Sequence, residues 1–225
     1  MHTVVEQPMV TGRPLVFAVL RVPFFLEPEY TMDESWSESN RERLIRKWGG
    51  KAQFEAQKRQ HRLKERGQEV GIEHFNLDRK ASSTFKSHRL VQWVTKQYGV
   101  TKAEALYSEL NRRHFEDGEP LNNTEMLLSA AELSGVDRVA AQAFLSTDAG
   151  STEIRAAQQQ LRRMGVHSIP TFVIGAQQVV SGAAHSDELV NAFRQIEERG
   201  EGAPNSVFGD ILGIPQEVLE RPLEL

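Results

Sequence analysis

The spacing of apolar residues changes twice along the chain. Residues 15–22 lie between two prolines and consist of valine, leucine, phenylalanine and alanine apart from Arg21, which is typical of a buried strand. From about residue 37 to residue 164, apolar positions recur every three or four residues, which predicts helices, except over residues 74–83, which lack this period and are predicted to form a loop. The period returns to two over residues 169–174 and 177–181, and the tight turn between these runs predicts an antiparallel hairpin.

Glycines and capping residues mark where the predicted helices begin and end. The predicted helices cover 37–48, 51–70, 85–98, 101–115, a stretch capped by Asn123, a short one capped by Asp137, one from Thr147 or Asp148 to Met164, and one from Ser186 to Gly200. The order of elements is therefore a strand, many helices, a hairpin and a final helix. This order predicts an α+β protein, or an α/β protein with a large helical insertion.

Composition narrows the possible chemistry. The net charge of −4 gives no general attraction to nucleic acid or to an anionic membrane, so neither is predicted as a partner. The chain has no cysteine, which excludes disulfides, sulfur ligands for metals and thiolate nucleophiles. No convincing targeting segment precedes the first apolar run, and we therefore predict a cytoplasmic protein.

The stretch Gly165–Ile174, followed by Val180–Gly182, resembles the end of the DsbA-like branch of thioredoxin-fold proteins. In that branch a similar glycine, valine and proline pattern forms the loop with a cis-proline and the next strand. Pro23–Pro28 and Ser87–Trp93 are similar to stretches of the FrnE-type subgroup, whose activity is protein disulfide oxidoreduction. The matching segments occur in the same order from about residue 14 to residue 197.

The resemblance implies an α/β fold, with a thioredoxin-like sheet and a large helical insertion at about residues 37–146. The domain would cover residues 14–200, after an N-terminal segment of residues 1–13 and before a C-terminal tail of residues 201–225. Residues 15–22 match the second strand of the family. The family's first strand and its Cys-Pro-Trp-Cys helix have no counterpart here.

Without that first strand, the middle of the sheet would contain unpaired backbone groups. Three outcomes are open: a rearranged sheet, a strand donated by a partner, and a truncated gene product, of which we favour the last. The sheet edge would also allow oligomers to form.

Pro170 is the strongest candidate for a binding site. The resemblance implies that its peptide bond is cis and that Ile169 offers backbone groups to an extended peptide or partner protein by β-augmentation. Ser168 belongs to the same predicted binding loop, and His167 precedes it. No catalytic residue is predicted. No histidine pair has ligand spacing, so we predict neither a metal nor a cofactor.

The stretch Lys58–Lys64 is locally basic and could contact RNA or an acidic protein. Glu55, Glu65 and Glu69 flank it, however, and mixed charge on a long helix is typical of a solvated face.

Three functions follow from these observations. The first is a DsbA-like domain that is inactive in thiol–disulfide exchange and binds a peptide or partner at the Pro170 loop. The second is a glutathione-dependent transferase or isomerase of the kappa type, which shares the architecture and uses a serine near its first helix. The third is a truncated form of an active disulfide oxidoreductase.

Overall fold

The computed structural model describes residues 1–9, 15–175, 178–200 and 207–221. The chain divides into two compact units. The first unit contains residues 1–26, 92–103 and 150–225, and the second contains residues 27–91 and 104–149. Two consecutive helices, α5 (Phe85–Tyr98) and α6 (Val100–Arg112), each contribute residues to both units. Among the described residues, none of the helices has the length and apolar character needed to cross a membrane.

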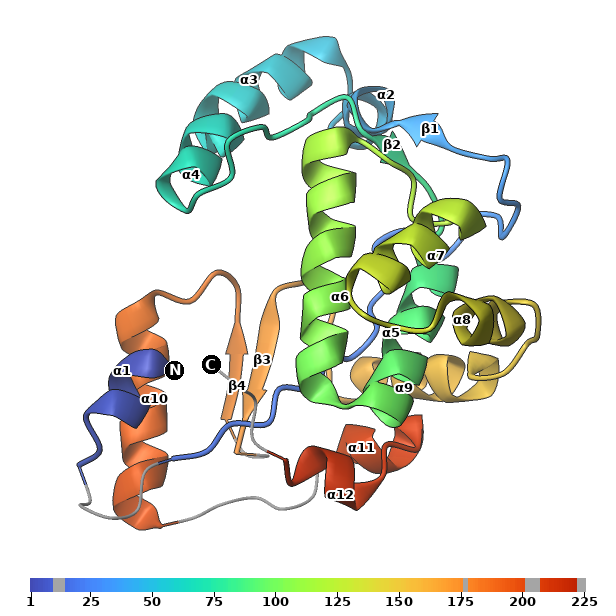
Figure 1. Cartoon of the computed structure of the whole chain (residues 1–225). Coiled ribbons are helices and arrows are strands. Elements are labelled where there is room, and N and C mark those ends of the chain that lie inside the picture. Colours follow the sequence, from blue (N-terminus) through green and yellow to red (C-terminus); the bar gives the residue numbers. More distant parts are fainter. Residues whose placement is uncertain (10–14, 176–177, 201–206, 222–225) are drawn as a thin grey trace. The chain divides into compact units, whose positions relative to one another are not determined.

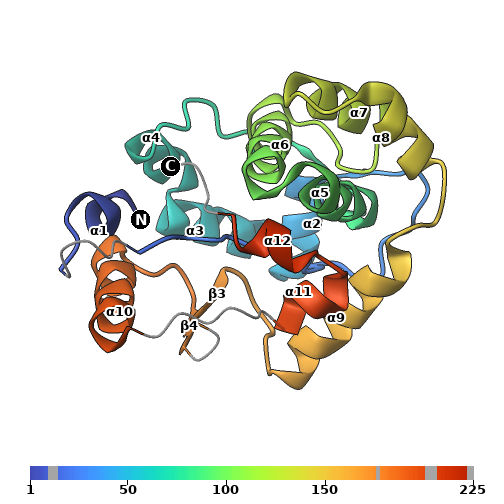
Figure 2. The same ribbon diagram turned by 60° about the horizontal axis from the view of Figure 1, so that its bottom comes forward.

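The first unit combines one hairpin with several helices (Figure 1). Its further elements are α1 (His2–Glu6), α9 (Ser151–Arg163), β3 (Thr171–Ile174), β4 (Gln178–Ser181), α10 (Ser186–Arg199), α11 (Val207–Leu212) and α12 (Gln216–Leu219). Helix α1 packs along α10, and α11 packs along α9 (Figures 1 and 2). Val4 of α1, Ile154 of α9 and Leu212 of α11 are fully buried. The described part of the C-terminal tail therefore contributes to the core of this unit.

The predicted hairpin is present. Strands β3 and β4 pair antiparallel, with Thr171 opposite Ser181 and Ile174 opposite Gln178. Gly175 follows β3 at φ +58°, in the left-handed region that glycine adopts at little cost. A Cβ at this position would lie 3.0 Å from Cδ1 of Ile196, so the turn also lies close to α10.

The prediction of a strand at residues 15–22 is wrong. These residues form no strand, and only two-stranded sheets occur among the described residues. The side chains nevertheless alternate in exposure, because residues 15, 17 and 19 are half-buried whereas residues 16 and 18 are exposed. Phe17 packs edge-on against Phe193 of α10 at 4.9 Å between ring centroids. An apolar alternating run becomes a strand only where a neighbour offers a ladder, and no described strand does so here.

Two glutamine side chains bind the backbone that follows this run. Nε2 of Gln92 on α5 donates to the carbonyl of Arg21 at 2.5 Å, and Nε2 of Gln158 on α9 donates to the carbonyl of Pro23. Both glutamines and Pro23 are buried. Buried carbonyls must be hydrogen-bonded, so these amides take the place of ladder partners.

The second unit is mainly helical. It contains β1 (Glu38–Ser39), α2 (Asn40–Lys47), α3 (Lys51–His61), α4 (Leu63–Glu69), β2 (Lys80–Ala81), the π-helical turn η1 (Arg113–Asp117), α7 (Thr124–Leu133) and α8 (Arg138–Leu145). Strands β1 and β2 form a second antiparallel pair. The core consists of aliphatic residues of α5, α6 and α7, of which Leu90, Leu106 and Leu127 are fully buried.

Two predicted caps are confirmed. The side chains of Asn123 and Asp137 accept hydrogen bonds from the backbone N–H groups of Met126 and Ala140. The predicted cap at Ser186 is wrong, because the preceding residue, His185, caps α10. The N–H of His185 donates to Glu188, which forms a capping box.

Two further boundaries differ from the sequence prediction. Helix α9 begins at Ser151 rather than at Thr147 or Asp148, because the buried guanidinium of Arg89 binds the carbonyls of Thr147 and Ala149. The single helix predicted for residues 51–70 is two helices, α3 and α4, which are separated at Arg62 with φ +45°. A left-handed residue cannot continue a right-handed helix.

We predict that Gln158→Ala lowers the free energy of unfolding by about 1–3 kcal/mol, because it leaves the buried carbonyl of Pro23 without its donor. Urea unfolding followed by circular dichroism measures the change. Gln159→Ala, at the exposed neighbouring position of the same helix, is the control. Equal stability of the two variants would show that the amide bond contributes nothing.

Candidate functional site

The loop between α9 and β3 presents the predicted binding residues to solvent. Gly165, at φ +73°, ends α9, and its N–H donates to the carbonyl of Arg162. Val166 is buried and anchors the start of the loop in the core. The next residues are exposed, among them Ser168, Ile169 and Pro170. The peptide bond between Ile169 and Pro170 is cis.

Hydrogen bonds tie this loop to the hairpin. The hydroxyl of Thr171 donates to the carbonyl of Ser168 at 2.8 Å. The N–H of Gly182 donates to the carbonyl of Pro170 at 2.9 Å and extends the β3–β4 ladder by one position. Two carbonyls of the loop are therefore already occupied, and the groups that remain for a ligand lie farther along β3.

Strand β3 has an open edge. In an antiparallel ladder, successive residues of a strand direct their backbone groups alternately toward the partner strand and away from it. The N–H of Gly182 donates to the carbonyl of Pro170, so these two residues form a hydrogen-bonded pair. With the register of the strands, this places Phe172 and Ile174 in hydrogen-bonded pairs with β4 as well. Thr171 and Val173 therefore direct their N–H and C=O groups away from β4. Within the part of the chain that the structure describes, no other strand pairs with β3.

The side chains along this edge are apolar and partly exposed. The exposed fractions are 49% for Ile169, 37% for Phe172 and 41% for Val173. Edge strands that avoid pairing usually carry a charge, a proline or a bulge. Residues 171–174 are Thr-Phe-Val-Ile and carry none of the charged or proline residues that serve this purpose. The arrangement can therefore accept an extended segment, with backbone hydrogen bonds and apolar contacts.

Comparison with known proteins gives the family. The family model described as the DSBA-like thioredoxin domain matches residues 18–194, which is well over half of the chain. The chain belongs to the DSBA-like thioredoxin domain family. Its fold is similar to the crystal structure of a probable DsbA oxidoreductase from Streptomyces coelicolor, with a TM-score of 0.68 and 26% identity. The match covers 82% of this chain and 76% of that one. The comparison with curated proteins gives no significant match.

These matches confirm the predicted family and the thioredoxin-like fold class. The family also makes the composition relevant to activity, because this DSBA-like domain contains no cysteine at any position. A polypeptide without a thiol cannot form the mixed disulfide through which thiol–disulfide exchange proceeds. The absence of cysteine is thus in keeping with the predicted inactivity in that reaction.

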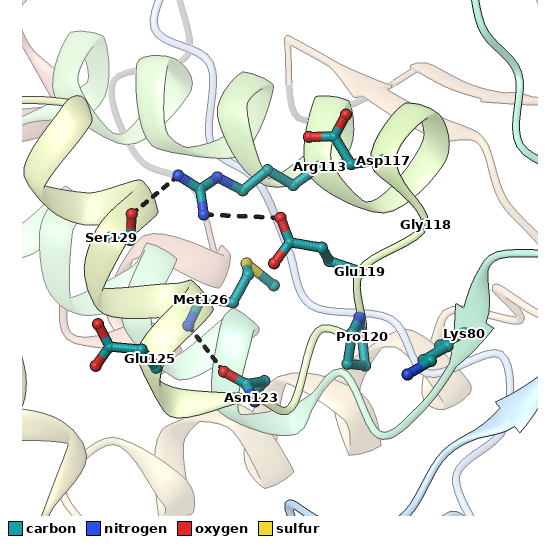
Figure 3. Close-up of a pocket in the computed structure, with 10 residues that line it drawn as sticks. All are labelled: Lys80, Arg113, Asp117, Gly118, Glu119, Pro120, Asn123, Glu125, Met126 and Ser129. Carbon is teal, nitrogen blue, oxygen red and sulfur yellow. Dashed lines mark hydrogen bonds and ion pairs between the residues drawn. The ribbon is translucent and has the colours of Figure 1, made fainter.

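The second unit of the DSBA-like domain contains a pocket that the sequence did not predict (Figure 3). Its volume is about 570 Å³, and it opens between η1, the loop that follows η1 and the first turns of α7. Its walls are formed by Lys80, Arg113, Asp117, Gly118, Glu119, Pro120, Asn123, Glu125, Met126 and Ser129. A π-helical turn has no clear sequence signature, so nothing in the residue pattern locates this cavity.

The charge of this pocket does not favour an anionic ligand such as glutathione. The guanidinium of Arg113 already donates to Glu109 at 2.7 Å and to Ser129 at 3.0 Å. It also lies 3.8 Å from the carboxylate of Glu119. The other two carboxylates of the lining are also paired, Asp117 with Arg112 and Glu125 with Arg138, so a single lysine, Lys80, remains to attract an anion. The pocket therefore gives no support to the kappa-type alternative.

A half-buried arginine and a half-buried histidine are hydrogen-bonded next to the pocket residue Glu119. Nε of Arg79 donates to Nε2 of His114 at 3.2 Å, and Nδ1 of His114 is 2.9 Å from the carbonyl of Glu119. The guanidinium of Arg79 lies over the rings of Phe75 and Phe115, at 5.6 Å and 4.8 Å from their centroids. Burial lowers the pKa of Arg79 to about 10 and, with the nearby guanidinium, lowers the pKa of His114 to about 4.

His114 is therefore a neutral acceptor at pH 7, and we predict that it makes the fold sensitive to acid. Its pKa is lower in the folded chain than in the unfolded chain, so the unfolded chain binds more protons between pH 6.5 and pH 4. The stabilisation is complete above pH 6.5 and is lost as the pH falls toward 4. The loss is on the order of 3 kcal/mol.

Urea unfolding at several pH values tests this expectation. His114→Gln, which has no titrating ring, should show a clearly smaller loss of stability over the same pH interval. His74→Gln, at an exposed position, is the control and should behave as the wild type. A variant at position 114 with an unchanged pH dependence would contradict the assignment.

Proposed function

We propose that this protein is a redox-inactive DSBA-like domain that binds an extended polypeptide segment along the open edge of β3. The observation that carries the proposal is a chain without cysteine in which the backbone N–H and C=O groups of Thr171 and Val173 are directed away from β4, beside partly exposed apolar side chains. The order of the motifs, from Pro23–Pro28 to Gly165–Ile174, supports assignment to the FrnE-type subgroup.

The binding would combine two interactions. The N–H and C=O groups of Thr171 and Val173 would pair with the backbone of the incoming segment, as in β-augmentation. Its side chains would contact Phe172 and Ile169, which are apolar and partly exposed. The carbonyl of Ser168 already accepts a hydrogen bond from the hydroxyl of Thr171, so it would not pair with the incoming backbone. Ser168 would therefore lie at the end of the bound segment. Backbone pairing depends little on sequence, so selectivity would come from the apolar contacts.

The first prediction concerns redox chemistry. The pure chain should not accelerate the reduction of insulin by dithiothreitol above the rate without protein, because it has no thiol to carry the exchange. The measurement is the turbidity of precipitating insulin chains, with thioredoxin as the positive control. Turnover by the cysteine-free chain would contradict the proposal.

The second prediction concerns binding. Val173→Pro removes an N–H from the open edge without removing a ladder bond to β4, because proline is tolerated at such edge positions. It should weaken binding of an alternating valine–threonine peptide by about tenfold or more, which corresponds to about 1.4 kcal/mol. Fluorescence anisotropy of the labelled peptide measures the change.

Val173→Thr is the matched control, because it keeps both the N–H and a β-branched side chain. Its affinity should remain close to that of the wild type. Circular dichroism would first establish that both variants keep the hairpin and melt as the wild type does. If the peptide does not bind, or if proline and threonine have equal effects, the open edge of β3 is not the binding site.

A further inference from the structure

Helices α3 and α4 form an arm, residues 51–70, that is almost entirely accessible to solvent. Phe54 and Gly67 are its only buried residues. Helices of 11 and 7 residues are marginal in water unless tertiary packing stabilises them. Phe54 provides such packing for α3 by stacking on Trp48 at 5.9 Å. The buried residue of α4 is a glycine, which provides very little.

The arm is basic in a chain that is acidic overall. It contains six cations and three carboxylates, whereas the whole chain carries a net charge of −4. The cations are Lys51, Lys58, Arg59, Arg62, Lys64 and Arg66, and all are exposed. None of the six is in a salt bridge with another described residue.

The neighbouring helix α2 differs in this respect. Arg41 binds Asp78, Arg43 binds Glu27, and Arg46 binds Glu38 through two hydrogen bonds of 2.8 Å. The surrounding surface thus pairs its cations with carboxylates of this chain, and the arm leaves its own cations available to another molecule.

The arm also exposes an apolar stripe. Leu63 is 39% exposed and Val70 is 75% exposed. Leu63 is the first residue of α4 and Val70 is its C-cap residue, seven positions later, with Arg66 between them. Gly71, at φ +83°, ends the helix, and the N–H of Ile72 donates to the carbonyl of Gly67 at 2.8 Å. An exposed apolar side chain therefore lies at each end of α4, and the stripe that these two side chains form is bordered by positive charge.

This combination identifies the kind of partner. The carboxylates of Glu55, Glu65 and Glu69 are interspersed among the cations, so the arm lacks the continuous positive surface that the uniformly negative backbone of a nucleic acid or an anionic membrane would need. A protein helix can place acidic residues opposite the cations and apolar residues opposite Leu63 and Val70. Protein interfaces have this composition, with an apolar centre and a polar rim.

We propose that the arm binds an acidic amphipathic helix of a partner protein, through its unpaired cations and the pair Leu63 and Val70. The site is separate from the open edge of β3 and does not depend on it. The occupied arm would gain the apolar contacts that α4 lacks in the described chain.

The test uses a synthetic peptide of about 20 residues with leucines on one helical face and glutamates beside them. Labelled peptide should bind the full chain, and Arg59→Glu/Arg66→Glu should weaken binding by about tenfold. Leu63→Gln/Val70→Gln should have a similar effect, because it removes the apolar contact and keeps good helix formers. Fluorescence anisotropy measures all three, after circular dichroism has established that the variants fold.

Matched controls lie on other helices. Lys102→Glu/Arg162→Glu changes the net charge equally, and Leu133→Gln/Val139→Gln removes residues that are 70% and 75% exposed. Both should bind as the wild type. Val173→Pro should also bind this peptide normally, which separates the arm from the β3 edge.

Three results would overturn the proposal. The first is no binding of the acidic peptide at low salt. The second is an equal loss of affinity in the control variants. The third is tighter binding of a single-stranded oligonucleotide, or of phosphatidylserine vesicles, that is insensitive to Leu63→Gln/Val70→Gln.

Discussion

Every buried backbone N–H and C=O group needs a hydrogen-bond partner, and the first unit meets this need largely without a sheet. Strand β3 pairs with β4 alone among the described residues, so one of its edges is open. The carbonyls of Arg21 and Pro23 are bound by glutamine side chains, where a larger sheet would supply a ladder. The backbone at residues 21–23 is thereby hydrogen-bonded, whereas one edge of β3 has no strand partner among the described residues.

The same unpaired groups connect the fold to the proposed function. The chain belongs to the DSBA-like thioredoxin domain family and contains no cysteine, so the proposed function depends on its scaffold and surfaces rather than on a thiol. On this scaffold the groups that would pair with a polypeptide, at Thr171 and Val173, lie beside exposed apolar side chains. Binding through backbone groups requires no catalytic residue, so the loss of thiol chemistry and the retention of a docking edge are compatible.

Charge is distributed unevenly in the second unit, and burial explains the difference. Arg79 and His114 are half-buried, and this burial lowers their pKa values, so the histidine is neutral at pH 7. The arginines of α2 differ in exposure, from 12% for the side chain of Arg43 to 65% for that of Arg46, and all three pair with carboxylates. The cations of the arm are exposed and have no such pairing within the described chain, and for this reason they are suited to an outside partner.

The sequence alone determined what depends on residue identity or on near neighbours. It excluded thiol chemistry, located the hairpin and the loop of Ser168, Ile169 and Pro170, and predicted the caps at Asn123 and Asp137. Only the tertiary structure decided that residues 15–22 form no strand, that α3 and α4 are separate, and that a pocket follows η1. These features depend on which distant groups meet each backbone segment, and a strand in particular exists only where a second strand lies beside it.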